Sequence, residues 1–409
     1  MKSAAEITAF LDAQRERQEA LLAELVRTPS DNPPGDCAPH AARTQSLLEA
    51  LGLAVAAHPV PEAECQAAGM RSVTNLIVRE RFGPGSTLVL NAHGDAVPPG
   101  EGWSADPYGA EVREGWMLGR GVAVSKSDIA AYAFTLLALR DAGLARGTVE
   151  LHVTYDEEAG GRLGPQWLLT HGLTQPDYAI CAGFSYAVVT AHNGCLHLEL
   201  SFHGVSAHAA EPEQGRDALE AATMVLASLY AHRRGYTRIR SATPGIGSPT
   251  LVAGLISGGT NTNVVPDRVT VRLDRRIIPE EQPERVQREL TEFIQRTAAL
   301  IPGVSCEVRC ILSAAPLKPL IGAERLATVL QRHGGVVLGE SIPTRGLPLY
   351  TDARHYAAAG IPTVLYGAGP RSLAEANAHR ADERLKLDDL ARATRVLTLA
   401  VGEVLGQGA

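Results

Sequence analysis

The pattern of hydrophobic and polar residues in the first half of the chain predicts strands that alternate with helices. Apolar, strand-like runs lie within residues 72–78, 86–95, 149–158 and 177–183. Helical periodicity is present at residues 6–27, in a second helix that ends near Leu51, in the run that follows Asp128, and in a short segment at 164–171. This alternation is typical of an α/β fold whose sheet is largely parallel.

The pattern changes at Cys195. From Leu196 to His203, apolar and polar side chains alternate strictly, which is typical of an antiparallel strand with one solvated face. A helix, two strands, a helix and a strand follow, giving a βαββαβ series. The α/β pattern then resumes and closes with a helix from about residue 386 to 405. We therefore predict a larger α/β domain of residues 1–194 and 314–409, interrupted by a βαββαβ domain of residues 195–313.

The amino-acid composition indicates which kind of partner the protein binds and which cellular compartment it occupies. The 409 residues carry a net charge of −7 and show no dense basic stripe, which argues against nucleic acid and favours a small-molecule partner. The six cysteines form no CxxC pair, which is typical of reduced thiols in the cytoplasm. The N-terminal segment lacks the apolar core of a signal peptide, and we expect no apolar run that approaches the ~20 residues of a membrane span.

Candidate chemistry lies where the predicted strands end. His93 and Asp95 end one strand, and the three consecutive acids Asp156, Glu157 and Glu158 follow another. His379 lies in a loop before the last helix. Ligands bind at the carboxyl ends of strands in open α/β sheets. Taken singly, each of these features also fits a solvated acidic turn or a surface histidine.

Taken together, the motifs resemble a known family. A series of short motifs follows in one order between residues 25 and 401: HGD, WSADPY, GRG with a lysine five residues on, DEE, GVSAH, GGTNTNVVPDR, DRR, TDAR, and AH with an acid four residues later. This order resembles the co-catalytic zinc peptidases and deacylases that include aminoacylase, acetylornithine deacetylase, succinyl-diaminopimelate desuccinylase and bacterial glutamate carboxypeptidase. The resemblance implies a catalytic α/β domain with a ferredoxin-like lid that pairs two subunits, and hence a homodimer.

The resemblance also implies roles for the residues at the strand ends. His93, Glu158 and His379 match metal ligands, Asp95 matches the carboxylate that orients His93, and Glu157 matches the general base that activates water.

Two family ligands are missing from this chain. The bridging aspartate position is Val124, in GRGVAVSKSD, and the carboxylate position in ICAGFS is Gly183. Neither half of the site then has the three protein ligands that catalytic zinc usually takes. We expect a degenerate site that holds zinc or another divalent metal only if the remaining ligands suffice, and we favour a vacated site over a full two-metal centre.

Two nearby residues are candidate replacements for the missing ligands. Asp128 lies one helical turn after Val124, and a displacement of roughly 6 Å along the axis argues against its bridging the same two ions. Cys181 lies two residues before Gly183 and is either a soft ligand or nucleophile, or a buried apolar cysteine.

The substrate-handling residues that the resemblance implies are all present. His208 matches the histidine that polarises a carbonyl, contributed in the family by the partner subunit, and Asn263 and Arg276 match groups that bind a substrate carboxylate. Gly367 and Gly369 match a backbone wall of the pocket. The alternative for each residue is a turn or surface position without a role in binding.

This combination leaves three functions open. The first is a hydrolase that cleaves a C–N, amide-type bond in a small carboxylate-bearing substrate such as an N-acyl or N-carbamoyl amino acid, with Glu157 as general base. The second is a metal-independent racemase, isomerase, lyase or cyclase in which Glu157 and His93 exchange a proton with substrate carbon. The third is a non-catalytic relative that binds a carboxylate ligand.

Overall fold

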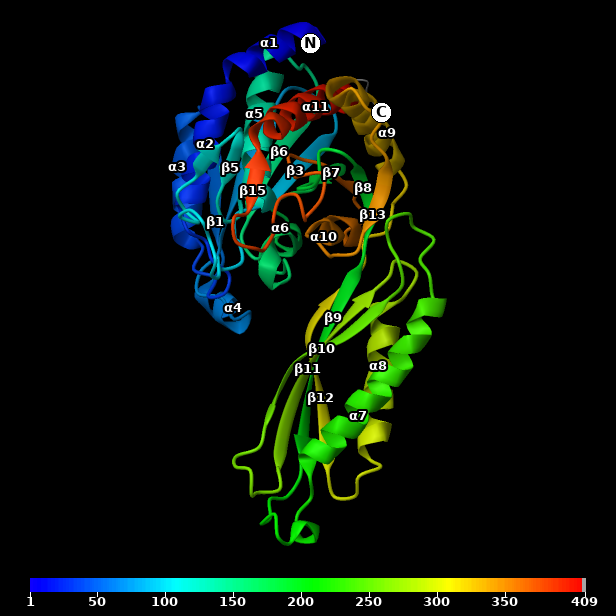
Figure 1. The fold of residues 1–409 in the computed structure, drawn as a ribbon. Helices are drawn as coiled ribbons and strands as arrows, with labels where there is room; N and C mark the ends of the chain where they lie inside the picture. Colours follow the sequence, from blue (N-terminus) through cyan, green and yellow to red (C-terminus); the bar gives the residue numbers. More distant parts are fainter. Residues whose placement is uncertain (407–409) are drawn as a thin grey trace. The chain divides into compact units, whose positions relative to one another are not determined.

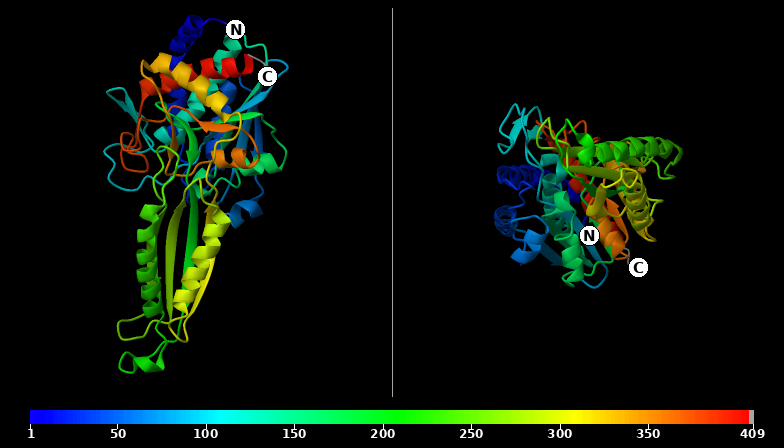
Figure 2. Two further views of the ribbon diagram at one scale, coloured as in Figure 1. Left: turned by 90° about the vertical axis from the view of Figure 1, so that its right-hand side faces the viewer. Right: turned by 90° about the horizontal axis from the view of Figure 1, so that it is seen from below.

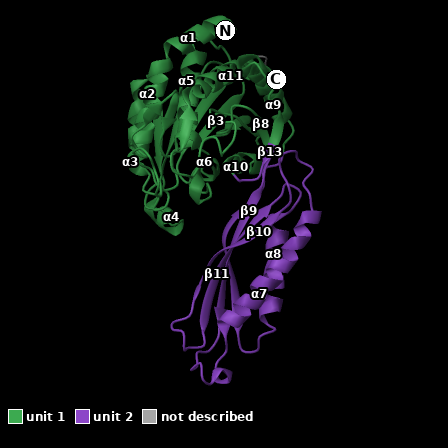
Figure 3. Ribbon diagram, in the orientation of Figure 1, with its two compact units in different colours: residues 1–190, 319–345, 351–409 green, residues 191–318, 346–350 purple. Residues whose placement is uncertain are grey.

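The chain forms two compact units. The computed structural model describes residues 1–406 and divides them into unit 1, with residues 1–190, 319–345 and those from 351 on, and unit 2, with residues 191–318 and 346–350 (Figure 3). Unit 1 is built around a mixed sheet and unit 2 around an antiparallel one. Each unit is described here by itself.

The sheet of unit 1 has eight strands in the order β1-β2-β6-β3-β7-β14-β8-β13. Its central strands β6, β3, β7 and β14 are mutually parallel, whereas β1, β2 and β8 pair antiparallel with their neighbours. The predicted α/β class with a mostly parallel sheet is confirmed. The strand bounds are β1 Val55–Pro59, β2 Thr74–Arg81, β3 Thr87–His93, β6 Thr148–Thr154, β7 Tyr178–Cys181, β8 Val188–His192, β13 Thr344–Leu347 and β14 Thr363–Leu365.

Helices cover this sheet (Figure 1). They are α1 Ala4–Ala13, α2 Arg15–Arg27, α3 Ala38–Ala50, α4 Glu62–Ala67, α5 Ser127–Asp141, α6 Pro165–Thr170, α9 Ala323–Leu338, α10 Ala353–Ala358 and α11 Leu387–Gly406. The prediction of one helix at residues 6–27 is wrong, because the chain breaks at Gln14. The break lets Ile7 and Leu11 pack with the outer cluster around Leu399, while the apolar side chains of α2 join the main core.

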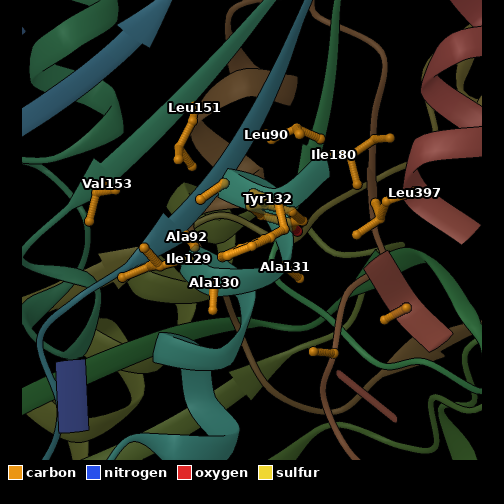
Figure 4. Close-up of a cluster of buried hydrophobic side chains, with 14 of the residues drawn as sticks. Leu90, Ala92, Ile129, Ala130, Ala131, Tyr132, Leu151, Val153, Ile180 and Leu397 are labelled. Atoms are coloured by element: carbon orange, nitrogen blue, oxygen red, sulfur yellow. The ribbon is translucent and has the colours of Figure 1, made fainter. Parts of the chain in front are cut away.

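Helix α5 is the central helix of unit 1. Ile129 and Tyr132 pack among buried side chains of the strands, including Leu90 of β3 (Figure 4). Among the described residues, 122–141 form the one helical segment long and apolar enough to cross a membrane, so the expectation that no run approaches that length is wrong. Nearly all of the segment is buried within the protein, as expected for a core helix that is apolar on every side.

A small three-stranded sheet lies beside the main one. It consists of β4 Glu111–Arg113, β5 Trp116–Leu118 and β15 Arg384–Lys386, in the order β15-β5-β4. β15 follows the loop that carries His379, and β5 precedes the GRG turn. Antiparallel pairing of these two strands therefore ties the His379 loop to the GRG turn.

Unit 2 has the predicted order of elements. Its elements are β9 Gly194–His203, α7 Ala218–Arg233, β10 Thr250–Gly258, β11 Arg268–Ile277, α8 Pro283–Ala298 and β12 Ser305–Ala314. The four strands form an antiparallel sheet in the order β10-β11-β9-β12. α7 and α8 lie side by side on one face of this sheet (Figure 2). Leu196, Leu198, Leu200 and Phe202 are buried in that core, as the alternating pattern predicts.

The central sheet also contains a buried ionic network. Burial alone would raise the pKa of Glu150 on β6, but hydrogen bonds from His152, Thr174 and Arg79 outweigh it and hold the pKa at about 2, below the ordinary 4.5. A carboxylate with a lowered folded-state pKa stabilises the protein above its unfolded-state pKa. That contribution is lost as the pH falls from about 4.5 toward 2.

We expect Glu150→Gln to flatten this acid dependence. The difference in unfolding free energy between wild type and variant should shrink by about 2–3 kcal/mol between pH 5 and pH 2, measured by urea unfolding at each pH. Glu62→Gln, at an exposed site on α4, is the matched control and should give a curve parallel to wild type. A constant difference between wild type and Glu150→Gln would contradict the assignment.

Candidate active site

The ends of three adjacent parallel strands define the candidate site. His93 is the last residue of β3 and pairs with Thr154 at the end of β6, just before the acidic turn. On the other side of β3, Asn91 pairs with Cys181, two residues before Gly183. Because these strands run in the same direction, their carboxyl ends meet at one edge of the sheet.

Asp95 fixes the orientation of His93. The Nδ1 atom of His93 lies 3.0 Å from the backbone oxygen of Asp95 and 3.4 Å from its Oδ1 atom. Both side chains are almost fully buried. A proton on Nδ1 donated to these oxygens leaves Nε2 as the free nitrogen of the ring, which is the arrangement that a metal ligand or a general base needs.

The same aspartate holds the acidic turn. The backbone N–H groups of Glu157 and Glu158 donate to the two carboxylate oxygens of Asp95, at 3.4 and 3.2 Å. Asn32 Nδ2 donates to Oδ2 as well, at 2.9 Å. Asp95 thus ties His93 and both glutamates into one assembly, and the ligand atoms of His93, Glu157 and Glu158 all lie within 4.8 Å of one another.

Crowding of these groups shifts their pKa values in the same direction. Burial works against the charged form of His93, but Asp95, Glu157 and Glu158 outweigh it and raise its pKa well above the ordinary value. Burial also raises the pKa of Glu157 well above its usual range, against the opposing effect of His93. A carboxyl group whose pKa is raised toward neutrality is matched to accepting and returning a proton.

His379 meets the acidic turn from the C-terminal loop. Its Nε2 atom lies 3.4 Å from Glu158 Oε1, and hydrogen bonding to Glu158 raises the pKa of His379. The backbone of His379 has φ 61°, in the left-handed region that non-glycine residues rarely adopt. Such strain is often held in place at functional sites, and here the loop brings an imidazole to a carboxylate.

The GRG turn is fastened to both sides of the site. Ser125 Oγ accepts the backbone N–H of His93 at 3.0 Å and donates to its carbonyl oxygen at 3.1 Å. Arg120 forms an ion pair with Glu383 at 2.5 Å, with both side chains about 1% exposed, and donates to the carbonyl oxygen of Arg380. Val124 lies on this turn, partly buried against the apolar core, and its side chain offers no ligand atom.

Asp128, in the first turn of α5, lies against Gly183. Its Oδ1 atom accepts the backbone N–H of Ala368 at 2.7 Å, and the N–H of Gly183 also donates to the carboxyl group. Burial raises its pKa to about 7, opposed by these donors and by the charge of His93. Gly367 and Gly369, expected in the wall of a substrate pocket, contact Asp128 and the backbone of Gly183.

Asp352 is a second acid that sequence reasoning left without a role. It is buried, and Thr154 Oγ1 donates to its Oδ2 atom at 3.3 Å. Burial raises its pKa to about 6, opposed by His93. A Cβ atom on Gly161 would lie 2.2 Å from Asp352 Oδ1, so the second glycine of DEEAGG makes room for this carboxylate. In the sequence, the TDAR motif, which contains Asp352, is the feature that could have identified this residue.

Cys181 is inside the sheet rather than in the site. It pairs with Asn91 on one side and Leu365 on the other, and it is 2% exposed. Burial raises the pKa of its thiol well above the ordinary value. A neutral, buried thiol is a poor nucleophile or metal ligand, which favours the structural alternative for this residue.

The remaining predicted residues belong to unit 2, where the strands separate them. The backbone N–H of Ala209 donates to the carbonyl oxygen of Asn263, so the exposed residues His208 and Asn263 lie together near the start of β11. Arg276 lies eight residues beyond Arg268 on the same strand, which is about 26 Å at the usual rise. One copy of unit 2 therefore does not bring Arg276 together with His208 and Asn263.

Comparison with known proteins places the chain in a family. The sequence matches the model of peptidase family M20/M25/M40 over residues 89–403, which is more than half of its length. The chain belongs to this family. It is 28% identical over 343 residues to the succinyl-diaminopimelate desuccinylase of Wolinella succinogenes, covering 81% of this chain and 88% of the relative.

Two further comparisons agree. The M20 chain is 29% identical over 341 residues to the acetylornithine deacetylase of Proteus mirabilis, covering 82% of each protein. Its fold is similar to that of the M20 family metallo-carboxypeptidase Sso-CP2 from Sulfolobus solfataricus, with a TM-score of 0.76 at 17% identity over 95% of this chain and 99% of the other. The resemblance to peptidases and deacylases seen in the motifs is confirmed.

One group of possible metal ligands lies at this edge of the sheet in the M20 chain. It consists of His93, Glu157 and Glu158, and His379 contacts Glu158 beside it. Carboxylate oxygen and imidazole nitrogen both suit zinc. Val124 and Gly183, at the positions where the motif resemblance implies two further ligands, offer no side-chain ligand atom.

We expect Arg120→Met to destabilise the M20 fold strongly. Glu383 would keep a buried charge without its partner, which typically costs about 3–5 kcal/mol, measured by urea unfolding. Arg113→Met breaks the exposed ion pair with Glu111 and serves as the matched control, with an expected loss below about 1 kcal/mol. Equal losses in the two variants would contradict a structural role for the Arg120–Glu383 pair.

Proposed function

We propose that the protein is a hydrolase that cleaves a C–N, amide-type bond in a small carboxylate-bearing substrate, such as an N-acyl or N-carbamoyl amino acid. The observation that carries this proposal is the partly buried Glu157 carboxyl beside the oriented imidazole of His93. The desuccinylase and the deacetylase among its relatives support it, because their names describe removal of an acyl group from nitrogen.

In this proposal Glu157 is the general base and then the general acid. Its carboxylate accepts a proton from the attacking water and returns that proton to the leaving nitrogen. Proton transfer by a positioned group contributes ~10²–10⁴-fold to the rate. Asp95 holds both Glu157 and His93 through hydrogen bonds, so the base and the imidazole keep a fixed relation during the reaction.

A metal contribution is proposed for one ion only. His93 and Glu158 would hold it, with His379 beside Glu158, and an ion in such a site polarises a carbonyl and lowers the pKa of water. The full two-metal centre of the family is not part of the proposal, because Val124 and Gly183 stand at two ligand positions. Burial of Glu157 and the charge of His93 would then carry a larger share of the catalysis.

Arg276 is the proposed receptor for the substrate carboxylate. Its Nε and Nη2 atoms each lie 3.0 Å from an oxygen of Asp274, which holds the guanidinium plane. His197 Nε2 lies 3.3 Å from Asp274 Oδ2 and supports the same carboxylate. Arginine is suited to this task because its planar fork can meet both oxygens of a carboxylate.

We also propose a homodimer formed through unit 2. His208 and Asn263 lie near the start of β11, and Arg276 lies about 26 Å along that strand from Arg268, so a second copy is needed if all three act on one small substrate. The edge strand β10 supports this, because Val252, Leu255 and Ile256 are more than half exposed on it. An exposed apolar edge strand is a ready template for pairing with another chain.

The cytoplasm is the proposed compartment. Within the described residues no disulfide is formed, and four of the six cysteines are buried. Free thiols persist in a reducing compartment, and small carboxylate substrates of the proposed class are soluble metabolites.

The first test replaces the proposed base. We expect Glu157→Gln to lower kcat for hydrolysis of an N-acyl amino acid by at least about 10²-fold, because glutamine accepts no proton. Activity would be found by screening N-acyl and N-carbamoyl amino acids and then measured as released amine. Glu101→Gln, an exposed residue, is the matched control and should retain the wild-type rate.

Two outcomes would count against hydrolysis. One is a Glu157→Gln variant with wild-type kcat. The other is deuterium on product carbon without release of amine when the reaction is run in deuterated water, which would favour proton transfer on carbon instead.

The second test concerns recognition of the substrate carboxylate. We expect Arg276→Ala to raise KM for an N-acyl amino acid at least about tenfold, whereas hydrolysis of the matching N-acyl amino amide, which lacks the carboxylate, should change little. Arg272→Ala on the same strand, whose guanidinium pairs with Glu199, is the control. Equal effects on acid and amide substrates would remove Arg276 from this role.

A further inference from the structure

A carboxyl group occupies the place where β7 ends, although it comes from another element. Asp128, on α5, accepts N–H groups from Ala368 and Gly183 through its carboxyl oxygens. A Cβ atom built on Gly367 would lie 1.8 Å from Asp128 Oδ1. The carboxyl group therefore fills a space that exists because residue 367 is glycine.

Position 183 has no room for a side chain of its own. A Cβ atom built there would lie 2.7 Å from the backbone nitrogen of Tyr366 and 2.9 Å from the carbonyl carbon of Leu365. Leu365 is the last residue of β14 and Tyr366 comes directly after it, so a larger residue at 183 would require the end of this strand to move. The backbone at this strand end and the carboxyl group of Asp128 are thus mutually adjusted.

The register of the sheet puts this carboxyl group beside His93. Asn91 of β3 pairs with Cys181 of β7, and the N–H of Ala182 donates to the carbonyl oxygen of Asn91 at 2.8 Å. Two residues further along each strand lie His93 and Gly183, and neighbouring strands are about 4.8 Å apart. His93 and the Gly183 N–H that donates to Asp128 therefore lie on adjacent strand ends, close enough for the charge of His93 to act on the carboxyl group of Asp128.

We propose that Asp128 is the carboxylate partner of His93 in binding one divalent cation, and that it replaces the ligand which residue 183 does not supply. The inference rests on the proposed function to the extent that this site holds one ion. Carboxylate oxygen and imidazole nitrogen are both ligands that zinc accepts. Asp128 does not replace the bridging group at Val124, so the number of ions stays at one.

Zinc affinity tests this directly. Protein freed of metal with a chelator is titrated with zinc by calorimetry, as wild type and as Asp128→Asn. We expect about one equivalent in wild type and a loss of affinity of at least about tenfold in the variant, since even an outer partner of a metal ligand is typically worth ~10–100-fold. Asp389→Asn is the matched control, because Asp389 is a buried carboxylate bonded to Tyr186 elsewhere in unit 1.

A double-mutant cycle separates ligation from a structural effect. If His93 and Asp128 bind the same ion, the losses in His93→Ala and Asp128→Asn should not add in the double variant. Thermal melting of the metal-free proteins checks that the asparagine variant is folded. Wild-type zinc affinity in Asp128→Asn, strictly additive losses, or no zinc bound by wild type would each overturn the inference.

These outcomes are distinguishable from failure of the proposed function. Hydrolysis of an N-acyl amino acid with unchanged zinc affinity in Asp128→Asn would refute the role of Asp128 alone. Zinc binding that depends on Asp128, without hydrolysis of any substrate in the screen, would refute the proposed function alone.

Discussion

The candidate site depends on the parallel pairing of β6, β3 and β7. Because these strands run in the same direction and in register, His93, the acidic turn and Gly183 reach one edge of the sheet. Water is largely excluded there, and several carboxyl groups surround one imidazole. The site is therefore governed by the balance between burial, which favours neutral forms, and the attraction between His93 and its acidic neighbours.

Asp95 holds His93 and the acidic turn in place. It accepts the N–H groups of the acidic turn, orients His93 and accepts the side-chain N–H of Asn32. A single buried carboxylate with this many partners is costly to remove, because each donor would lose its acceptor in a dry environment.

Much of the fold could be read from the sequence, because strand and helix periodicities differ and strand-end chemistry is short-range. The alternation from Leu196 to His203 predicted a half-buried strand correctly. The break at Gln14 could not be read, because the helical pattern continues across it. The place of Asp128 could not be read either: helical spacing gave its distance from Val124 but not the space that Gly367 leaves for its carboxyl group.

The ion pair between Arg120 and Glu383 joins residues 263 positions apart, and Glu383 also accepts the backbone N–H groups of Gly119 and Ala123. It fastens the GRG turn to the His379 loop from within the protein. The frame of the site is thus supplied by protein groups alone, and a ligand on it can change without loss of the frame. The GRG turn and the His379 loop are therefore joined by side chains that are separate from the candidate ligands His93, Glu158 and His379.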